Sequence, residues 1–180
     1  MYSIVNKCLN VRKKPLYVAF IDFQKAFDSV NRQILYDILI KKGIQGKLQN
    51  SVKSIYSSVK ATVRTSKGIV TDCFSCPVGL RQGCNLSPIL FILFIDEFFT
   101  LLKENNIRGI QLFPEIVEIF TLLFADDIAC LSDTVVGLQR QLNILKDFCE
   151  TYNLTVNTSK TKIMVFKNGG RLSRNEKWYY

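Results

Sequence analysis

The sequence predicts an α+β domain in which short apolar strands alternate with amphipathic helices. Short apolar runs rich in β-branched and aromatic side chains are bounded by turn residues, as is typical of buried strands. Longer segments repeat their apolar residues every three or four positions, as helices with one buried face do. The 180 residues are 48% hydrophobic and 12% aromatic. This composition excludes a disordered chain and is sufficient for one folded core.

The first third of the chain predicts one strand followed by two helices. Residues 16–21 form an apolar run that ends at Asp22. Asn31 is a suitable N-cap for a helix that ends at 41–43, where two lysines precede a glycine. A second helix is expected over 46–56. The residues expected to face inward are Ile34, Leu35, Ile38 and Leu39 in the first helix and Leu48, Val52, Ile55 and Tyr56 in the second.

The middle of the chain predicts a hairpin and a long helix. Residues 59–65 and 69–74 are typical of two strands joined by a short turn. A glycine-punctuated loop, 78–83, leads to a helix over 87–104, whose serine and proline suit an N-cap and the first helical position. This helix is apolar nearly all round at first, so we expect it to be buried against a sheet. Its apolar stretch, 88–95, is too short to span a membrane.

The last third predicts two strands joined by an acidic turn, then a helix and a final strand. The strands are expected at 116–124 and 128–131, on either side of the acidic pair 126–127. Apolar residues at three- and four-residue spacing predict a helix over 134–152, and 162–166 is typical of a strand.

Carboxylates stand at the ends of two predicted strands. Asp22 follows the first strand, and Asp126 and Asp127 form the acidic turn. If these strands are neighbours, three carboxylates meet at one end of a sheet. Such oxygen ligands suit Mg²⁺ or Mn²⁺, and two ions about 4 Å apart serve in-line phosphoryl transfer. The adjacent pair by itself also fits an ordinary hairpin turn, because aspartate favours turns for local reasons.

The chain contains no histidine, which excludes His-ligated zinc, Ser-His-Asp or Cys-His catalysis and any imidazole base. Among six cysteines only Cys73 and Cys76 have ligand-like spacing, and no second pair completes a zinc site, so we expect reduced thiols. No apolar N-terminal run precedes a cleavage site. We therefore expect an intracellular protein, of the nucleus or the cytoplasm, that is not secreted.

The net charge of +9 is concentrated in the first third of the sequence. Residues 1–60 contain eleven Lys and Arg against three Asp, a surplus of +8. Clusters such as 12–14 and 41–42, with single lysines at 47, 53 and 60, could follow a phosphate backbone. A merely solvated basic surface is the alternative.

Four segments resemble motifs A, B, C and D of reverse transcriptases, in that order. They are 19–30 (AFIDFQKAFDSV), 79–88 (GLRQGCNLSP), 124–127 (FADD) and 157–162 (NTSKTK). The Phe-Ala-Asp-Asp variant resembles the enzymes of LINE-like, non-LTR retrotransposons and of group II introns. The resemblance covers about 10–168. It implies one partial reverse transcriptase domain over 1–180, with a palm core at about 16–168.

The resemblance implies a polymerase palm: an antiparallel sheet with helices packed on one face, partial fingers and no thumb. The implied activity is that of an RNA-directed DNA polymerase, which transfers a nucleotide from a dNTP to a primer 3′-OH. The implied cofactors are two Mg²⁺ ions, with Mn²⁺ as a substitute. The implied partners are an RNA template, a DNA primer, dNTPs, and the fingers, thumb and endonuclease regions of a longer polyprotein, with no membrane.

The resemblance also assigns residue roles at the reaction centre. Asp22 and Asp126 are the principal ligands of the metal ions, Asp127 completes the acidic cluster, and the Phe23 carbonyl contributes. Lys160 matches the proposed general acid for the leaving pyrophosphate. A solvated surface lysine is the alternative for Lys160.

Further residues of the motifs are expected to contact the dNTP or the primer and template. They are Phe27, Arg81, Gln82, Gly83, Phe124 and Ala125. Phe27 matches the aromatic residue that excludes a ribose 2′-OH, although one of 13 phenylalanines can equally be a core residue. The loop that carries Gln82 is also explained as a helix-entry turn, and both interpretations can hold.

Two other classes of function stay open. The chain could be a truncated, catalytically inactive remnant of a mobile element, or a basic nucleic-acid-binding module that retains the palm. The acidic residues and Gln82 are all present, which favours an enzyme.

Overall fold

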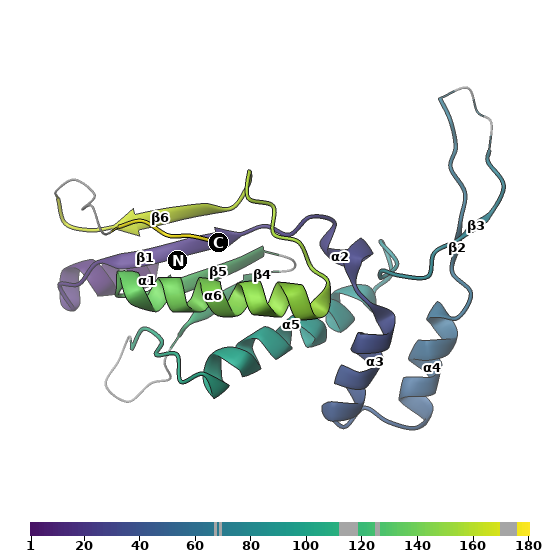
Figure 1. The fold of residues 1–180 in the computed structure, drawn as a ribbon, viewed down its shortest axis with the longest axis horizontal. Coiled ribbons are helices and arrows are strands. Elements are labelled where there is room, and N and C mark those ends of the chain that lie inside the picture. The colour runs from purple at the N-terminus through teal and green to yellow at the C-terminus, as the bar shows by residue number, and fades with distance from the viewer. Residues whose placement is uncertain (67, 69, 112–118, 125–126, 170–175) are drawn as a thin grey trace. The chain divides into compact units, whose positions relative to one another are not determined.

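The computed structural model describes residues 1–180 except 67, 69, 112–118, 125–126 and 170–175 (Figure 1). The chain forms two compact units. The sheet unit comprises Met1–Ala26 and Ile95–Tyr180, and the helical unit comprises Phe27–Phe94. Helix α5 (Ser87–Glu104) contributes its first turns to the helical unit and the remainder to the sheet unit.

A four-stranded antiparallel sheet is the centre of the sheet unit. Its strands, in spatial order, are β4 (Thr121–Phe124), β5 (Asp127–Ser132), β1 (Leu16–Ile21) and β6 (Lys162–Phe166). Each lies within or next to a segment in which the sequence predicts a strand, and the two strands that carry the acidic residues are neighbours. The predicted antiparallel sheet is therefore confirmed, with β1 between β5 and β6.

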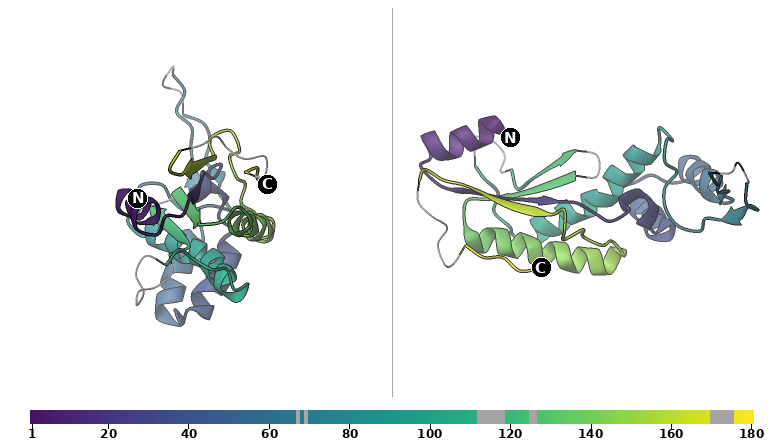
Figure 2. Two further views of the ribbon diagram at one scale, coloured as in Figure 1. Left: turned by 90° about the vertical axis from the view of Figure 1, so that its left-hand side faces the viewer. Right: turned by 90° about the horizontal axis from the view of Figure 1, so that it is seen from above.

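Side chains of β1 alternate between two covered faces. Leu16 and Val18 pack in one cluster with Ile4 and Cys8, which belong to the N-terminal helix α1 (Tyr2–Asn6) and the π-helical turn that continues it, Lys7–Val11. Helix α6 (Val135–Tyr152) packs on β5 and β1, and the view from above places it on the side of the sheet opposite α1 (Figure 2). The N-terminal helical segment was not assigned from the sequence, and it covers the face of the sheet on which no helix was expected.

Helix α6 begins and ends as its sequence predicts. The Thr134 hydroxyl accepts a hydrogen bond from the Gly137 N–H, and Asn153 ends the helix in the left-handed conformation. The buried side chains are spaced three and four residues apart, and they include Phe148, whose ring lies 5.6 Å from that of Phe98 on α5. Among the described residues, no helix is both long enough and apolar enough to cross a bilayer.

The helical unit contains α2 (Ala26–Ser29, which begins in the sheet unit), α3 (Arg32–Lys41), α4 (Lys47–Tyr56), a small hairpin of β2 (Lys60–Ala61) and β3 (Phe74–Ser75), and the start of α5. Asn31 caps α3, because its side chain accepts from the N–H groups of Gln33 and Ile34. The hairpin is antiparallel as predicted, but its ladder is shorter than the predicted strands. Val63 and Val70 are exposed, so burial does little to stabilise a longer ladder.

The predicted inward face of α4 is half wrong. Val52 and Tyr56 are buried, whereas Leu48 is 60% exposed and Ile55 is 40% exposed. Gln49 is buried instead. The buried stripe follows positions 49, 52 and 56, which lie on one side of a helix, and the neighbouring positions turn away from it.

Candidate active site

Asp22 and Asp127 lie at the same end of the two central strands. Ile21 of β1 pairs with Ile128 of β5, and Asp22 follows the first while Asp127 precedes the second. The antiparallel register therefore places the two aspartates across from each other. Both line a cavity of about 420 Å³, the acidic pocket, together with Phe20 and Lys160. Asp126 lies outside the described residues.

The segment 155–161, which precedes β6, hydrogen-bonds to the end of β1 and contributes Lys160 to the acidic pocket. The Asn157 N–H donates to the Asp22 carbonyl at 2.7 Å, and the Gln24 N–H donates to the Thr155 carbonyl at 2.8 Å. The Asp22 N–H in turn donates to the Thr161 hydroxyl at 3.2 Å. Backbone contacts thus bring the predicted motif D beside motif A, although more than a hundred residues separate them in the sequence.

Lys160 is positioned by the turn that these contacts fix. Its N–H donates to the Asn157 carbonyl at 3.1 Å, and its ammonium nitrogen lies 4.0 Å from Asp22 Oδ2. The Lys160 side chain is 71% exposed and that of Asp22 is 30% exposed. A long exposed side chain in so loose an ion pair is free to reach other anions in the pocket.

The acidic pocket fits a divalent cation. Asp22 Oδ2 is buried and has no hydrogen-bond donor among the described residues. A buried carboxylate oxygen without a hydrogen bond is unfavourable, and the Lys160 ammonium at 4.0 Å compensates it only in part, so a closer cation would stabilise it. Within the described part of the chain, which leaves out Asp126, no three Asp, Glu, Cys or His residues are placed to hold an ion. A complete ligand set therefore needs a group beyond the described acids, such as Asp126 or a backbone carbonyl.

Phe23 and Phe124 flank the acidic residues. The Phe23 side chain is buried, so only its main chain is available to a ligand. The bridge between Phe23 and Val156 uses the Asp22 carbonyl and the Gln24 N–H on either side of Phe23. Phe124 pairs with Asp127 at the end of β4. The Phe124 side chain and Ala125 lie outside the described residues.

A second cavity, of about 310 Å³, lies within the helical unit. It is lined by four residues that the sequence assigns to substrate contacts, Phe27, Arg81, Gln82 and Gly83, and by Cys84, Asn85, Ser87 and Pro88. We call it the loop cavity. The Leu80 N–H donates to the Phe27 carbonyl at 2.7 Å, and Gln82 Nε2 donates to Asp28 Oδ1 at 3.0 Å. These bonds hold the glycine-punctuated loop against α2.

Phe27 is packed against α5 and also lines the loop cavity. Its ring stacks on that of Phe91 of α5, with centroids 4.8 Å apart and planes at 22°, so it is packed. It is also half-buried and lines the loop cavity. The stacking covers one face of the ring, and the remainder of Phe27 lines the loop cavity.

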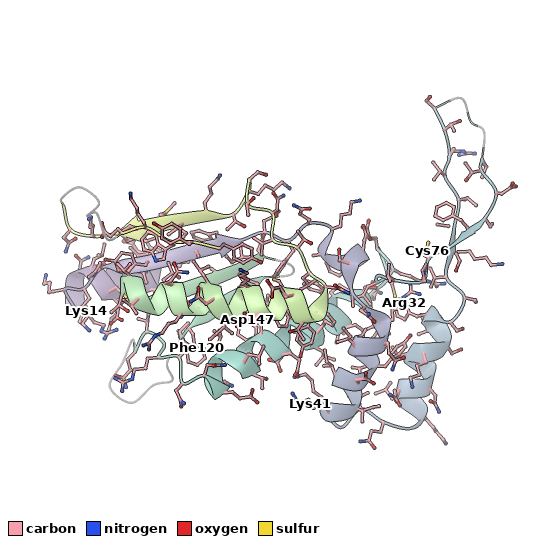
Figure 3. All side chains as sticks on the ribbon, in the orientation of Figure 1. Lys14, Arg32, Lys41, Cys76, Phe120 and Asp147 are labelled. Carbon is pink, nitrogen blue, oxygen red and sulfur yellow. The ribbon has the colours of Figure 1, made fainter. Side chains whose placement is uncertain are left out.

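Arg32 anchors the loop and was not predicted from the sequence (Figure 3). Its guanidinium donates to the carbonyls of Gly79 at 2.7 Å, Val78 at 3.0 Å and Tyr56 at 3.1 Å, and it lies over the Tyr56 ring. The residue is only 8% exposed. The available signal was its place on the buried stripe of α3, one turn before Leu35, where a charged residue needs a partner.

Gly79 makes the second anchor of the loop. Its φ of +84° is unfavourable for other residues, and a Cβ there would lie 2.7 Å from the Asp28 carbonyl oxygen. The backbone of the loop therefore approaches α2 more closely than any side chain allows.

Residues 2–178 match the family model described as reverse transcriptase (RNA-dependent DNA polymerase). The chain belongs to this family. The motifs that suggested the resemblance lie within the matched residues, and the match extends to the α1 segment and the C-terminal residues.

Relatives of this reverse transcriptase domain come from mobile elements. A Pol polyprotein of the type-1 retrotransposable element R2 of Nasonia vitripennis is 30% identical over 172 residues, which cover 95% of this chain and 16% of that protein. The RNA-directed DNA polymerase of the mobile element jockey of Drosophila funebris is 26% identical and is covered to 19%. The non-LTR type expected from the sequence is confirmed. This domain spans less than a quarter of either relative.

Solved telomerase structures share the fold. The telomerase of Candida tropicalis, solved with a fragment of telomeric RNA, matches 93% of this chain with a TM-score of 0.64 and 16% sequence identity, and 29% of that chain is covered. The telomerase of Candida albicans matches 91% with a TM-score of 0.63 and 15% identity. The predicted palm-type α+β fold is therefore confirmed.

Proposed function

We propose that this domain is the catalytic palm of an RNA-directed DNA polymerase, which adds nucleotides from dNTPs to a primer 3′-OH on an RNA template. The observation that supports this most directly is the acidic pocket. There two carboxylates on neighbouring strands, one with a buried oxygen that accepts no hydrogen bond from the described residues, lie beside an exposed lysine. Such a group of acids is suited to phosphoryl transfer, and the chain has no histidine for other acid–base chemistry.

In this proposal Asp22, Asp126 and Asp127 hold two Mg²⁺ ions, which Mn²⁺ can replace. When bound, the ions lower the pKa of the primer hydroxyl and stabilise the negative charge of the leaving pyrophosphate. The protein residues contribute position: the sheet register fixes Asp127 across from Asp22, and the segment 155–161 fixes the turn that carries Lys160.

Lys160 acts as the general acid in this proposal. Its ammonium group is exposed and held only loosely by Asp22, so it can move to a leaving phosphate and donate a proton there. A lysine is well suited to this role because its positive charge also attracts the pyrophosphate.

The loop cavity binds the incoming nucleotide and the template base in this proposal. Gln82 offers an amide, Arg81 offers a charged fork for phosphate, and Gly83 allows a close approach of the backbone. In this proposal the Phe27 ring, held by its stacking on Phe91, lies beneath the incoming sugar and excludes a 2′-OH. The domain therefore prefers dNTPs to rNTPs.

The test is dNTP incorporation on a primed RNA template with Mg²⁺ or Mn²⁺, by the wild type and by Asp126→Asn. Incorporation by the wild type alone supports the proposal. Asp147→Asn, an exposed acid on α6, is a matched control that should keep full activity. Salt-sensitive nucleic-acid binding without incorporation identifies a binding module instead. The absence of both identifies an inactive remnant, and full activity of Asp126→Asn contradicts the metal assignment.

A further inference from the structure

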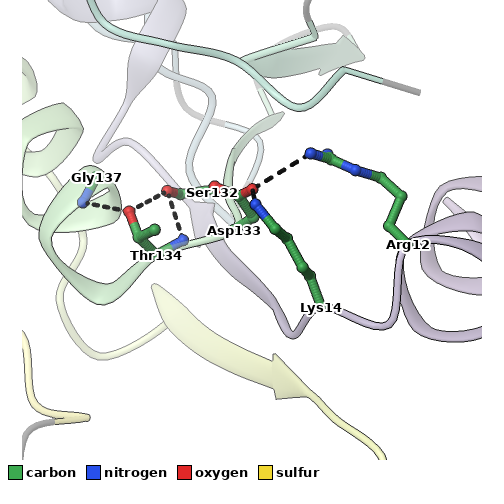
Figure 4. Close-up of polar contacts among 6 residues, drawn as sticks. All are labelled: Arg12, Lys14, Ser132, Asp133, Thr134 and Gly137. Carbon is green, nitrogen blue, oxygen red and sulfur yellow. Dashed lines mark hydrogen bonds and ion pairs between the residues drawn. The ribbon is translucent and has the colours of Figure 1, made fainter. Parts of the chain in front are cut away.

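The sheet unit contains a second large cavity at the end of the sheet opposite the acidic pocket. It has a volume of about 490 Å³ and lies beside Ser132, the last residue of the strand that begins at Asp127. A strand of this length separates the two ends by roughly 20 Å. The charged and capping residues that line this basic cavity are Arg12, Lys14, Arg108, Asp133, Thr134 and Arg140. Figure 4 shows four of them, Arg12, Lys14, Asp133 and Thr134.

Positive charge exceeds negative charge in the basic cavity. Four of its lining side chains are cationic and one is a carboxylate. Asp133 Oδ2 lies 3.1 Å from the Lys14 ammonium and 3.6 Å from Arg12 Nη2, so both side chains converge on one oxygen (Figure 4). Arg108 and Arg140 are exposed, and neither is paired with a carboxylate in the described part of the chain. Counted over the described lining residues, this single aspartate leaves a surplus of three positive charges.

Hydrogen-bond donors in the basic cavity also exceed acceptors. Arg12 Nη1 is buried and has no acceptor among the described residues. The Thr134 hydroxyl accepts from the Gly137 N–H at 3.0 Å, so the two preceding amides at the start of α6 have no partner within the helix. This start is the positive end of an 18-residue helix. A buried guanidinium nitrogen without an acceptor indicates a missing anion.

We propose that the basic cavity binds phosphates of a single-stranded nucleic-acid backbone. Guanidinium groups and helix amides suit a phosphate, which offers several acceptor oxygens. The volume is enough for about one nucleotide. Lys13, between two of the lining residues, extends the positive charge along the surface, as a chain of phosphates requires. An acidic peptide fits less well, because few apolar side chains line the cavity.

This site is separate from the proposed reaction. It lies at the other end of the sheet, uses none of the residues assigned to nucleotide transfer, and needs no bound metal. It explains the basic segment 12–14, which the resemblance to polymerases leaves without a role.

The test measures binding of a short fluorescent single-stranded RNA by anisotropy at about 50 to 200 mM salt. The variant Arg108→Gln/Arg140→Gln removes two exposed cations, so its fold should be intact. We expect about tenfold weaker binding and a salt dependence whose log–log slope is smaller by about 1.5. Lys146→Gln, an exposed cation of α6 outside the cavity, is the matched control and should change affinity less than about twofold.

A variant that is expected to tighten RNA binding distinguishes a binding role of the cavity from structural damage. Asp133→Asn removes the one carboxylate among the described residues that line the basic cavity, and should tighten RNA binding about threefold or more. Structural damage does not tighten binding. Unchanged affinity in the double variant, or equal losses in it and in Lys146→Gln, overturns the proposal.

Two further ligands identify the source of the phosphates. If the double variant loses affinity for a DNA of the same sequence as much as for the RNA, the cavity contacts a phosphate backbone common to both. If it loses affinity for the RNA alone, the cavity is assigned to the template. Tighter binding of a polyglutamate peptide than of either nucleic acid overturns the proposal in favour of a protein partner. Because Asp126→Asn should bind normally in these assays, failure of the polymerase proposal and failure of this one are distinguishable.

Discussion

The sheet unit and the helical unit hold their predicted functional residues in different ways. In the sheet unit, Asp22 and Asp127 are placed by strand register, and Lys160 by main-chain hydrogen bonds. In the helical unit, Gln82 and its loop are held by a buried side chain, Arg32, and by a glycine contact. The difference indicates that side chains of the acidic pocket can be changed without harming the fold, whereas the loop cavity depends on a few anchoring residues.

The largest effect is expected from Asp22→Asn. Its backbone keeps the hydrogen bonds to Asn157 and Thr161, so the melting temperature should be nearly unchanged. Primer extension should fall at least about 1000-fold, because amide oxygens bind metal ions more weakly than carboxylates do. Primer-extension assays and thermal melts of the same preparations check the loss of activity and the unchanged melting temperature. A large drop in melting temperature would show that the acid has a structural role.

Arg32→Ala, in the helical unit, should lower stability, in contrast to Asp22→Asn, which should lower activity alone. Three backbone carbonyls lose their donor, so we expect a loss of about 4 kcal/mol in the free energy of unfolding. Gln33→Ala, at the exposed neighbouring position, should cost less than about 0.5 kcal/mol. Urea denaturation measures both. Equal stability of the two variants would contradict the anchoring role.

Two glycines of the same loop give a sharper comparison. Gly79→Ala should cost about 3 kcal/mol, because it adds a clash with the Asp28 backbone to an unfavourable φ. Gly83→Ala has a similar φ of +78° but meets nothing within 4 Å, so about 1 kcal/mol is expected. Urea denaturation of both variants measures the difference. A difference near zero would show that the loop can move away from α2.

The smallest expected effect is a difference in reactivity between the cysteine thiols of the two units. A hydrogen bond from the Leu86 backbone N–H, with smaller contributions from its neighbours, lowers the pKa of Cys84, whereas burial raises that of Cys130 to about 12 and that of Cys149 to about 11. A lower pKa means more thiolate at a given pH. Alkylation of Cys84 by iodoacetamide should therefore have its midpoint at a lower pH than that of an ordinary exposed thiol.

Mass spectrometry of digested protein follows each cysteine separately in this experiment. Cys130 and Cys149 should stay unmodified in the folded chain at neutral pH and react only after unfolding. Faster alkylation of Cys130 or Cys149 than of Cys84 would contradict the expectation that burial protects these two thiols.

Much of the fold was predictable because its signals are local. The strands at 16–21 and 162–166, the helix cap at Asn31, the helix over 134–152 and the ends of α5 each depend on residues within one or two turns. The inward face of α4 was partly wrong because two apolar residues sit beside the buried stripe, and the sequence does not show how wide that stripe is. The N-terminal helix was missed because it spans only five residues before the π-helical turn, which is too short for a periodic pattern to stand out.

The sequence by itself determined the family, the order of the motifs and which acids belong to the predicted reaction centre, because each motif is a short pattern with fixed spacing. Only the tertiary structure decided that β1 and β5 are neighbours, that the segment 155–161 hydrogen-bonds to the end of β1, and that Arg32 holds the loop. It also gathered Arg12, Arg108 and Arg140 around one cavity. These arrangements join residues far apart in the chain, and their energies come from packing and hydrogen bonds that no local pattern encodes.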